Sequence, residues 1–485
     1  MHIDSADVST TAAMRIATEP VEFLRRYPEY EQTRVLDELR TTEYSYLDEQ
    51  GHTYLDYTGA GLAAKAQFRA HQERLAGGVF GNPHSINPTS TASTAQVEST
   101  RQAVLRHVNA DPDDYAVIFT ANATAAARLV GEAYPFHLGS RFVLTSDNHN
   151  SINGLREFAR AGRARTTYVP VEPPELRVST GVVEKVLSRG NGLFAYPAQS
   201  NFSGVRHPLE WVGLARERGY DVLLDCAAFL PTTRLDLSVV RPEFVIASWY
   251  KLFGYPTGVG CLIARRDALA RLRRPWFSGG TITAVSVQGR WHRMAAAEAA
   301  FEDGTLNFLA IPDVRVGLEW VAGIGMATIG RRVRALTGWT LDRLTALRHG
   351  NGAPLVRMYG PVTTQARGGT VTFNVLTPDG GLVDERVIAV ESAAARISLR
   401  TGCFCNPGAG ENAFGVTPRS LRRLRGVRTL DEYLEATGLA MAGAVRVSFG
   451  VASTVGDVER FVRFVEETYR DRVPDTRGLP PRDSC

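Results

Sequence analysis

Lysine is scarce in this chain of 485 residues, because 52 of its 55 basic residues are arginine. The three lysines are Lys65, Lys185 and Lys251, so chemistry that needs a primary amine has three candidates. Lys65 and Lys185 lie in runs typical of exposed helices. Lys251 instead follows the apolar run 244–247 and precedes a turn rich in glycine and proline. That placement predicts an amine at the end of a core strand, where α/β folds hold ligands.

Cysteines, long apolar stretches and net charge are also limited, and each of these features excludes a class of protein. The five cysteines are an odd number scattered along the chain, which does not indicate a disulfide framework. No apolar stretch is long enough to cross a bilayer, and residues 1–20 lack the apolar core of a signal peptide. The net charge of +4 is small for this length and argues against a nucleic-acid partner. We therefore expect a cytoplasmic enzyme without membrane or nucleic-acid partners.

Short apolar runs alternate with helical patterns along most of the chain. Because these runs are continuously apolar, they predict strands in a sheet that is covered on both faces. Alternation with helices makes that sheet mainly parallel, so we predict an α/β fold. The runs are residues 116–119, 141–144, 192–196, 222–225, 244–247 and 260–264.

The domain organisation follows from changes in composition. Residues 1–53 are expected to form a polar, partly helical arm, and residues 54–338 a large domain. Strand patterns at 370–375 and 445–449 and a helical pattern at 454–467 predict a smaller α+β domain over residues 339–473. Residues 474–485 are rich in proline and are expected to form a tail.

Asp225 supports a functional interpretation of Lys251. It closes the strand pattern 222–225, as Lys251 follows another strand. A lysine can hold pyridoxal phosphate (PLP) as a Schiff base, and a fixed carboxylate keeps the pyridine nitrogen protonated. Taken singly, Lys251 could be a surface lysine and Asp225 a turn or helix cap. The pair is much more specific than either residue alone.

Three further segments follow strands and carry polar side chains. Ala123 and Thr124 begin a helical pattern, and a helix N-terminus with a hydroxyl can bind a phosphate, although it could be an ordinary cap. His149 could stack on the cofactor ring or be solvated. Asn201 could bond the cofactor's phenolic oxygen or form a turn.

The segment from Arg400 to Gly408 is the remaining candidate. Arg400 could bind a substrate carboxylate with two hydrogen bonds, or form a surface salt bridge. Cys403 and Cys405 lie in a loop flanked by glycine and proline, where a thiol can be exposed and mobile. A thiolate near an arginine is a plausible nucleophile, and the alternatives are metal ligation or burial. Two cysteines are too few for structural zinc, so we expect no metal site.

These segments together resemble the class V, fold-type I PLP enzymes and, among them, the cysteine desulfurases. The likeness is greatest to the amino-terminal domain of the molybdenum cofactor sulfurases. It covers residues 54–473 and is most specific at Leu399-Arg400-Thr401-Gly402-Cys403-Phe404-Cys405-Asn406. The other segments that carry it are Gly81-Asn82-Pro83-His84-Ser85, Val117-Ile118-Phe119-Thr120-Ala121, Tyr196-Pro197-Ala198-Gln199-Ser200-Asn201-Phe202-Ser203-Gly204, Tyr250-Lys251-Leu252-Phe253-Gly254, Phe301-Glu302-Asp303-Gly304-Thr305 and Val445-Arg446-Val447-Ser448-Phe449-Gly450.

The resemblance implies a seven-stranded type of sheet, a PLP cofactor and roles for the matching residues. Lys251 would form the Schiff base, and Asp225 would bind the pyridine nitrogen. Cys405 would take sulfur from the substrate. His149 would stack on the cofactor ring, and Asn201 would bond its phenolic oxygen. The phosphate would be bound by Ala123, Thr124 and Ser248, and Thr281 would reach the phosphate of the neighbouring subunit in a homodimer. Arg400 would bind the substrate carboxylate.

Two departures from the family pattern matter. Many cysteine desulfurases have glutamine three residues after the aspartate, where this chain has Ala228, as the sulfurase-like group would suggest. The molybdenum cofactor sulfurases also carry a carboxy-terminal domain that binds the cofactor to be sulfurated. We expect this chain, which ends at Cys485, to lack it, so the sequence does not name the sulfur acceptor.

The resulting hypothesis is an L-cysteine desulfurase that forms a cysteine persulfide and alanine and supplies sulfur to a protein or small-molecule acceptor. The first alternative is another class V PLP enzyme, a C–S lyase or an aminotransferase, in which Cys405 would be dispensable. The second is a non-catalytic sulfur-relay protein. Lys251 and Asp225 argue against this second alternative.

Overall fold

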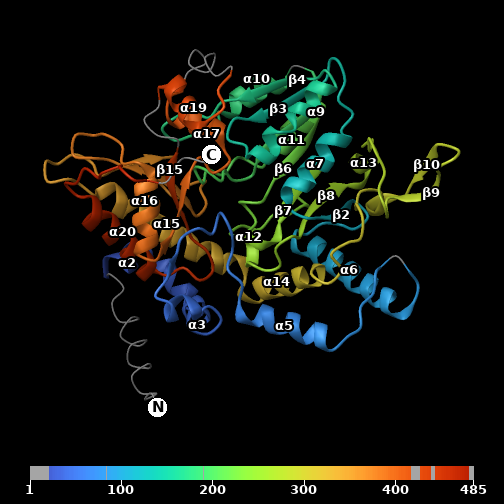
Figure 1. Cartoon of the computed structure of the whole chain (residues 1–485), viewed down its shortest axis with the longest axis horizontal. Helices are drawn as coiled ribbons and strands as arrows, with labels where there is room; N and C mark the ends of the chain where they lie inside the picture. The colour runs from blue at the N-terminus through green and yellow to red at the C-terminus, as the bar shows by residue number, and fades with distance from the viewer. Residues whose placement is uncertain (1–20, 84, 189, 417–425, 439–442, 480–485) are drawn as a thin grey trace.

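The computed structural model describes residues 21–83, 85–188, 190–416, 426–438 and 443–479. At its centre is a seven-stranded sheet with the strand order β2-β8-β7-β6-β5-β3-β4 (Figure 1). The strands are β2 (Tyr115–Thr120), β3 (Arg141–Thr145), β4 (Arg165–Val169), β5 (Gly192–Pro197), β6 (Tyr220–Asp225), β7 (Phe244–Ser248) and β8 (Gly260–Arg265).

Neighbouring strands from β4 to β7 are parallel, and β8 is antiparallel to both of its neighbours. The prediction of a mainly parallel sheet is therefore confirmed, and all six predicted apolar runs form strands in it. The seventh strand, β4, was not among them. It lies at an edge of the sheet and is only partly buried, so it lacks the continuous apolar run of the central strands.

Both faces of the sheet are buried. Successive side chains of a strand point to opposite faces, and they enter two separate apolar clusters. Val117 and Phe119 belong to one cluster, whereas Ile118 of the same strand belongs to the other. Helices cover the sheet (Figure 1): α7 contacts β7 and β8, and α11 contacts β6.

The helices of this part of the chain are mostly short. They are α5 (Lys65–Ala76), α6 (Pro88–His107), α7 (Ala123–Ala133), α8 (Asn150–Asn153), α9 (Arg156–Ala161), α10 (Thr180–Leu187), α11 (Trp211–Glu217), α12 (Trp249–Phe253), α13 (Arg266–Leu269) and α14 (Ile311–Ile324), with the 3-10 helix η2 (Ala297–Ala300). An antiparallel hairpin of β9 (Ile282–Ser286) and β10 (Trp291–Met294) projects from this body (Figure 1).

The carboxy-terminal part is built on a second, antiparallel sheet with the order β11-β12-β15-β14. Helix α15 (Met326–Ala346) spans the expected division at 338/339, so one continuous helix links the two parts. The other elements are β11 (Val356–Tyr359), β12 (Thr370–Val375), β14 (Arg400–Gly402), β15 (Ala444–Ser448), α16 (Glu385–Ala394), α17 (Pro407–Ala413), α19 (Leu430–Thr437) and α20 (Val455–Tyr469).

Residues 21–53 pack on this carboxy-terminal part. They form α2 (Val21–Arg26), the 3-10 helix η1 (Pro28–Thr33), α3 (Val35–Thr42) and α4 (Tyr46–Glu49). Phe23 is fully buried, and its ring centroid lies 5.7 Å from that of Trp339 in α15. The following strand β1 (Thr53–Tyr54) pairs in parallel with β13 (Ile397–Ser398). Residues 1–20 of the expected arm and 480–485 of the expected tail lie outside the described residues.

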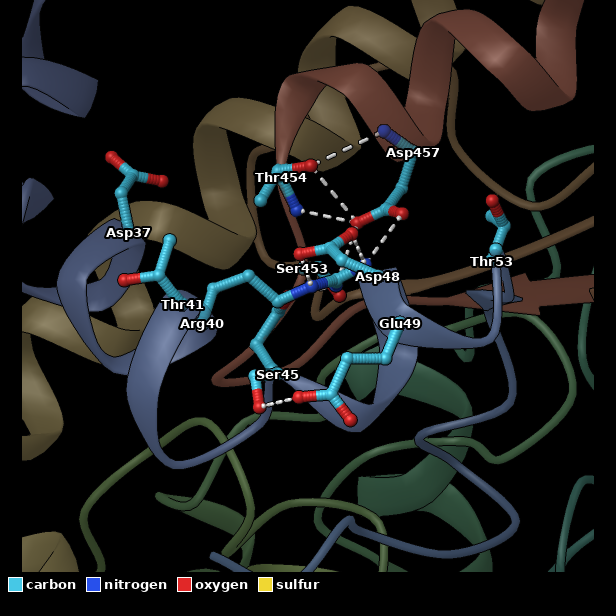
Figure 2. Close-up of polar contacts among 12 residues, drawn as sticks. Asp37, Arg40, Thr41, Ser45, Asp48, Glu49, Thr53, Ser453, Thr454 and Asp457 are labelled. Carbon is cyan, nitrogen blue, oxygen red and sulfur yellow. Dashed lines mark hydrogen bonds and ion pairs between the residues drawn. The ribbon is translucent and has the colours of Figure 1, made fainter. Parts of the chain in front are cut away.

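Arg40 fastens this amino-terminal segment to α20 (Figure 2). Its Nε and Nη2 each donate to the Asp48 carboxylate at 3.0 Å, and its Nη1 donates to Asp457 at 3.2 Å. The Asp457 carboxylate also accepts from the backbone N–H of Thr454 and thereby caps α20. Arg40 and Asp457 are both buried, so each compensates the charge of the other.

None of the helices in the described part of the chain combines the length and apolar composition that crossing a bilayer requires.

We predict that Arg40→Met lowers the free energy of unfolding by about 3 kcal/mol, because it leaves the buried Asp457 carboxylate without its cation. The matched control is Arg69→Met, which removes an exposed ion pair with Glu43 and should cost less than about 1 kcal/mol. Urea unfolding measures both values. Equal losses in the two variants would contradict the anchoring role of Arg40.

Candidate active site

A cavity of about 380 Å³ opens at the carboxyl ends of β5, β6 and β7. Ligands of open α/β sheets bind at this edge. The cavity brings together seven of the ten predicted site residues, which come from five different segments of the chain: Ala123, Thr124, His149, Asn201, Asp225, Ser248 and Lys251. Thr281, Arg400 and Cys405 do not line it.

Lys251 lies in α12, the short helix that directly follows β7. Because β7 ends at Ser248, the helix carries the lysine past the edge of the sheet and into the cavity. Burial lowers the pKa of the Lys251 ammonium, while the nearby Asp225 carboxylate opposes that shift. The neutral amine, which attacks carbonyl carbons, is thus present at lower pH than in an ordinary lysine.

Asp225 and His149 occupy the same cavity. Asp225 is the last residue of β6, and its Oδ1 accepts a hydrogen bond from the backbone N–H of Ala227 at 2.9 Å. His149 caps α8, where its Nδ1 accepts from the backbone N–H of Ser151 at 3.1 Å. Burial, and then the charge of Lys251, lower the pKa of His149. The ring is therefore held neutral, with Nε2 left to carry the proton.

Polar groups also gather at the N-terminus of α7. Asn122 caps the helix by accepting from the backbone N–H of Ala125 at 3.0 Å. The backbone N–H of Ala123 donates to the hydroxyl of Ser248 at 2.9 Å, and the Thr124 hydroxyl lies 2.7 Å from that of Ser151. These hydroxyls stand at the positive end of the helix dipole, which favours an anion.

Gly260 lets this helix start lie close against β8. A side chain there would bring its Cβ within 2.6 Å of the backbone of Asn122 and 2.7 Å of the carbonyl oxygen of Ala247. Only glycine permits this approach, which sets the N-terminus of α7 directly beside the end of β7.

The donor set of the cavity fits pyridoxal phosphate. Asp225 supplies a carboxylate for a protonated ring nitrogen, and Lys251 supplies an amine for the aldehyde. The start of α7 and its hydroxyls suit the phosphate. The cavity volume is also within the range of cofactor sites. In the described part of the chain, no group of histidine, cysteine, aspartate and glutamate side chains could hold a metal ion.

Asn201 connects this cavity to the cysteine loop. Its Nδ2 donates to the carbonyl oxygen of Phe404 at 2.9 Å, and its Oδ1 accepts from Asn406 Nδ2 at 2.8 Å. On the other side, the backbone N–H of Asn150 donates to the carbonyl oxygen of Cys405 at 2.7 Å. The loop was expected to be mobile, but its backbone is anchored on both sides of Cys405.

The conformation of the loop is also unusual. Phe404 and Cys405 both adopt left-handed backbone conformations, with φ of 58° and 52°. Such conformations are costly for residues other than glycine and persist where surrounding contacts enforce them. Cys405 is a half-buried free thiol, whereas Cys403 is buried and disulfide-bonded. Among the cysteines of the described residues, Cys405 is thus the free thiol that is partly exposed and can act as a nucleophile.

Sequence reasoning missed Arg446. This residue of β15 is buried, donates to Asp56 Oδ1 at 2.8 Å and to the carbonyl oxygen of Asn201 at 3.1 Å, and lies over the ring of Phe404. Its charge contributes to the lowered pKa of Lys251. One arginine among 52 gives no signal in a sequence, and its importance comes from the strand that buries it.

Arg400 lies opposite Arg446 in the pairing of β14 with β15. Its side chain is exposed, and its Nη1 lies 3.9 Å from Asp56 Oδ2, so the two arginines share one carboxylate. Thr281 is buried in its own loop, where its hydroxyl donates to the carbonyl oxygen of Ser278 and accepts from the Ser278 N–H.

Comparison with known proteins defines the class to which this fold and site belong. The described core matches the solved structure of a cysteine desulfurase from Thermococcus onnurineus, with a TM-score of 0.75 and 23% identity over 89% of this chain and 98% of that one. A structure described as the cystine C–S lyase C-DES matches with a TM-score of 0.65 and 18% identity over 86% of this chain and 97% of that one. The architecture is therefore that of fold-type I PLP enzymes.

The family follows from the sequence. A model of the aminotransferase class-V family matches residues 53–461, so the chain belongs to that family. It is 35% identical to the molybdenum cofactor sulfurase of Arabidopsis thaliana, over 92% of this chain and 60% of that protein. The chain thus spans about 60% of the length of this curated relative.

We predict that iodoacetamide at pH 8 modifies Cys405 before Cys226 and Cys261. Both of the latter are buried, and burial raises the pKa of each thiol, so their reactive thiolate forms are scarce. Peptide mapping by mass spectrometry measures the order. The denatured protein, in which these three thiols should react alike, is the control. Modification of Cys226 or Cys261 as fast as Cys405 in the folded protein would contradict the geometry.

Proposed function

We propose that this protein is a PLP-dependent L-cysteine desulfurase that forms a persulfide on Cys405, releases alanine and passes the sulfur to a protein or small-molecule acceptor. One observation carries the proposal. The loop that holds the free thiol of Cys405 is hydrogen-bonded by Asn201 to the wall of the cavity that contains Lys251. The names of the sulfurase relative and of the desulfurase neighbour agree with it.

Pyridoxal phosphate, when bound, supplies an electron sink that weakens bonds around the α-carbon of an amino acid. The Lys251 amine would hold the cofactor through its aldehyde and, when free, would take the α-proton of the substrate. The lowered pKa of Lys251 favours the neutral amine that this proton transfer needs. Asp225 would hold the proton on the pyridine nitrogen. His149, whose pKa is lowered by burial, would stack on the ring.

The other residues orient cofactor and substrate. Asn201 keeps a second N–H that can reach the phenolic oxygen while the first holds Phe404. Arg400, which is exposed and outside the lining of the cavity, would bind the substrate carboxylate, since Asp56 lies 3.9 Å away and compensates its charge only partly. The phosphate would bind at the start of α7, which Ala123 begins, and at the hydroxyls of Thr124 and Ser248 beside it.

The sulfur transfer balances without an external oxidant. The Cys405 thiolate attacks the sulfur atom of the bound cysteine, and a new S–S bond forms as the C–S bond breaks. The electron pair of the broken bond stays with the carbon, which is protonated to become the methyl group of alanine. The anchored backbone of the loop fixes where the thiol starts, and its half-exposed position leaves a path toward an acceptor.

A C–S lyase is the competing proposal, and the shared fold with C-DES favours it over an aminotransferase. In a lyase or an aminotransferase Cys405 would have no role. In a non-catalytic relay protein, Lys251 and Asp225 would have no role.

We also propose that the protein is a homodimer with its active sites at the interface. The proposal gives Thr281, which precedes the projecting β9–β10 hairpin and does not line the cavity of its own chain, a role at the phosphate of a second copy. Its hydroxyl, buried and bonded to Ser278 in the single chain, would have to turn outward to take that role. The hairpin exposes Val285 and Trp291, as an interface would require. Sedimentation velocity should give a dimer, and a fully active monomer would exclude this arrangement. We further propose a cytoplasmic location, which the free thiols of Cys226, Cys261 and Cys405 support and the disulfide at Cys403 opposes.

We predict that the purified protein is yellow, and that Lys251→Ala loses covalently held cofactor and turnover. Borohydride reduction followed by peptide mapping should place the cofactor on Lys251. Lys185, on the exposed face of α10, is the matched control. Because burial lowers the pKa of Lys251, reductive labelling of its amine by pyridoxal phosphate and borohydride should reach a plateau at lower pH than that of an ordinary lysine. Cofactor found on Lys65 or Lys185 would refute the site.

We predict that Cys405→Ala still changes the cofactor spectrum when L-cysteine is added, yet releases alanine at least roughly a hundredfold more slowly, because the nucleophile is gone. The matched variant Cys403→Ala should keep most of the activity, since that residue is disulfide-bonded and buried. Alanine formation measures both. If Cys405→Ala released alanine at the rate of the parent, the persulfide mechanism would be wrong.

A further inference from the structure

A second cavity, of about 590 Å³, lies between α15 and the loops that follow β5, β6 and β11. Five arginines line it: Arg206, Arg234, Arg331, Arg334 and Arg367. No aspartate or glutamate lines it. No carboxylate lies within 4 Å of any of the five guanidinium groups in the described part of the chain, and most other arginines of that part have such a partner.

A third cavity, at the amino ends of β5 and β6, has arginines that are paired with carboxylates. That cavity, of about 450 Å³, also contains two arginines. There, Arg216 pairs with Glu243 at 3.0 Å and Arg271 with Asp221 at 2.6 Å, and both carboxylates line the same cavity. The cavity with five arginines has no such carboxylate among the described residues.

Arg367 and Arg206 are the inner members of the set. Arg367 is only 5% exposed; its Nη2 donates to the carbonyl oxygens of Ser203 and Thr370, and its Nε and Nη1 are buried without a partner. Burial, and then the charge of Arg177, lower the pKa of Arg367 to about 9. Burial and the charge of Arg334 lower that of Arg206 to about 10.

The N-terminus of α15 adds a positive field from a different source. Gly325, Met326 and Ala327 line the cavity, and α15 runs for 21 residues from this end. No side chain caps its first turn. A long helix with free N–H groups at its start attracts anions, and here it faces the same space as the arginines.

We propose that this cavity binds a phosphorylated small molecule of the size of a nucleoside diphosphate. Planar guanidinium groups match the oxygens of phosphate, and several of them suit a ligand with more than one phosphoryl charge. The volume accommodates a molecule of that size. Arg331 and Arg334 lie at the exposed mouth and would meet the phosphates first.

The proposed site adjoins the cofactor cavity but is separate from it. Arg206 Nε donates to Gln199 Oε1 at 3.1 Å, and Gln199 lines the cofactor cavity. A phosphate bound at the arginines would contact Arg206, and the partner of Arg206, Gln199, lines the cavity that contains Lys251. The proposal does not depend on the desulfurase assignment.

The test is calorimetric titration of the holoenzyme, whose cofactor already fills the phosphate position at α7, with pyrophosphate and with ADP as probes. We expect both to bind more weakly in high salt, and the double variant R331Q/R334Q to weaken binding at least roughly tenfold. Arg463→Gln is the matched control, because Arg463 is an exposed helical arginine outside the cavity. It should leave the affinity unchanged.

Thermal unfolding of each variant confirms that it is folded before it is titrated. The proposal is overturned if neither probe binds at millimolar concentration, or if R331Q/R334Q binds both probes as tightly as the parent. It is also overturned if a hexaglutamate peptide binds the parent more tightly than ADP and loses that affinity in R331Q/R334Q. That result would assign the arginines to an acidic protein segment.

Discussion

The hydrogen bonds of Asn201 hold together the two halves of the proposed active site. Asn201 follows β5 of the large sheet, yet both ends of its amide bind the loop that carries Cys405 about 200 residues later. Asn406 extends the link, since its Nδ2 also donates to the carbonyl oxygen of Asp147. These contacts hold the loop of Cys405 against the wall of the cavity that contains Lys251. Because these groups are buried, each lost hydrogen bond would leave an unsatisfied polar atom.

Charge organises the same region. Two basic side chains, Lys251 and Arg446, and two acidic ones, Asp225 and Asp56, lie in this region, and burial lowers the pKa of His149. Burial lowers the pKa of Lys251 and favours its neutral form, while the carboxylates of Asp225 and Asp56 oppose that shift. A cofactor with an aldehyde, a ring nitrogen and a phosphate matches this distribution, since each of its groups meets a side chain of the complementary kind.

The strands that end at the candidate site could be predicted from the sequence, because they depend on local apolar patterns. The apolar runs that end at Asp225 and just before Lys251 form adjacent parallel strands, with Asp225 beside Ile246, so both side chains emerge at one edge of the sheet. The polar edge strand β4 escaped the prediction, because it lacks a continuous apolar run. The roles of Arg446, Asn406 and the arginine cavity could not be predicted, because they arise from contacts between distant segments. In a chain with 52 arginines, only the fold separates Arg367, buried without a carboxylate, from the many that are paired at the surface.

The central claim is that sulfur leaves cysteine for Cys405 while the carbon skeleton becomes alanine. The most direct measurement is the set of products that purified protein forms from L-cysteine, with and without a thiol reductant. The account predicts alanine and sulfide in equal amounts when the reductant is present, and a persulfide on Cys405 when it is absent. Formation of pyruvate and ammonia in place of alanine would contradict the account and identify a C–S lyase.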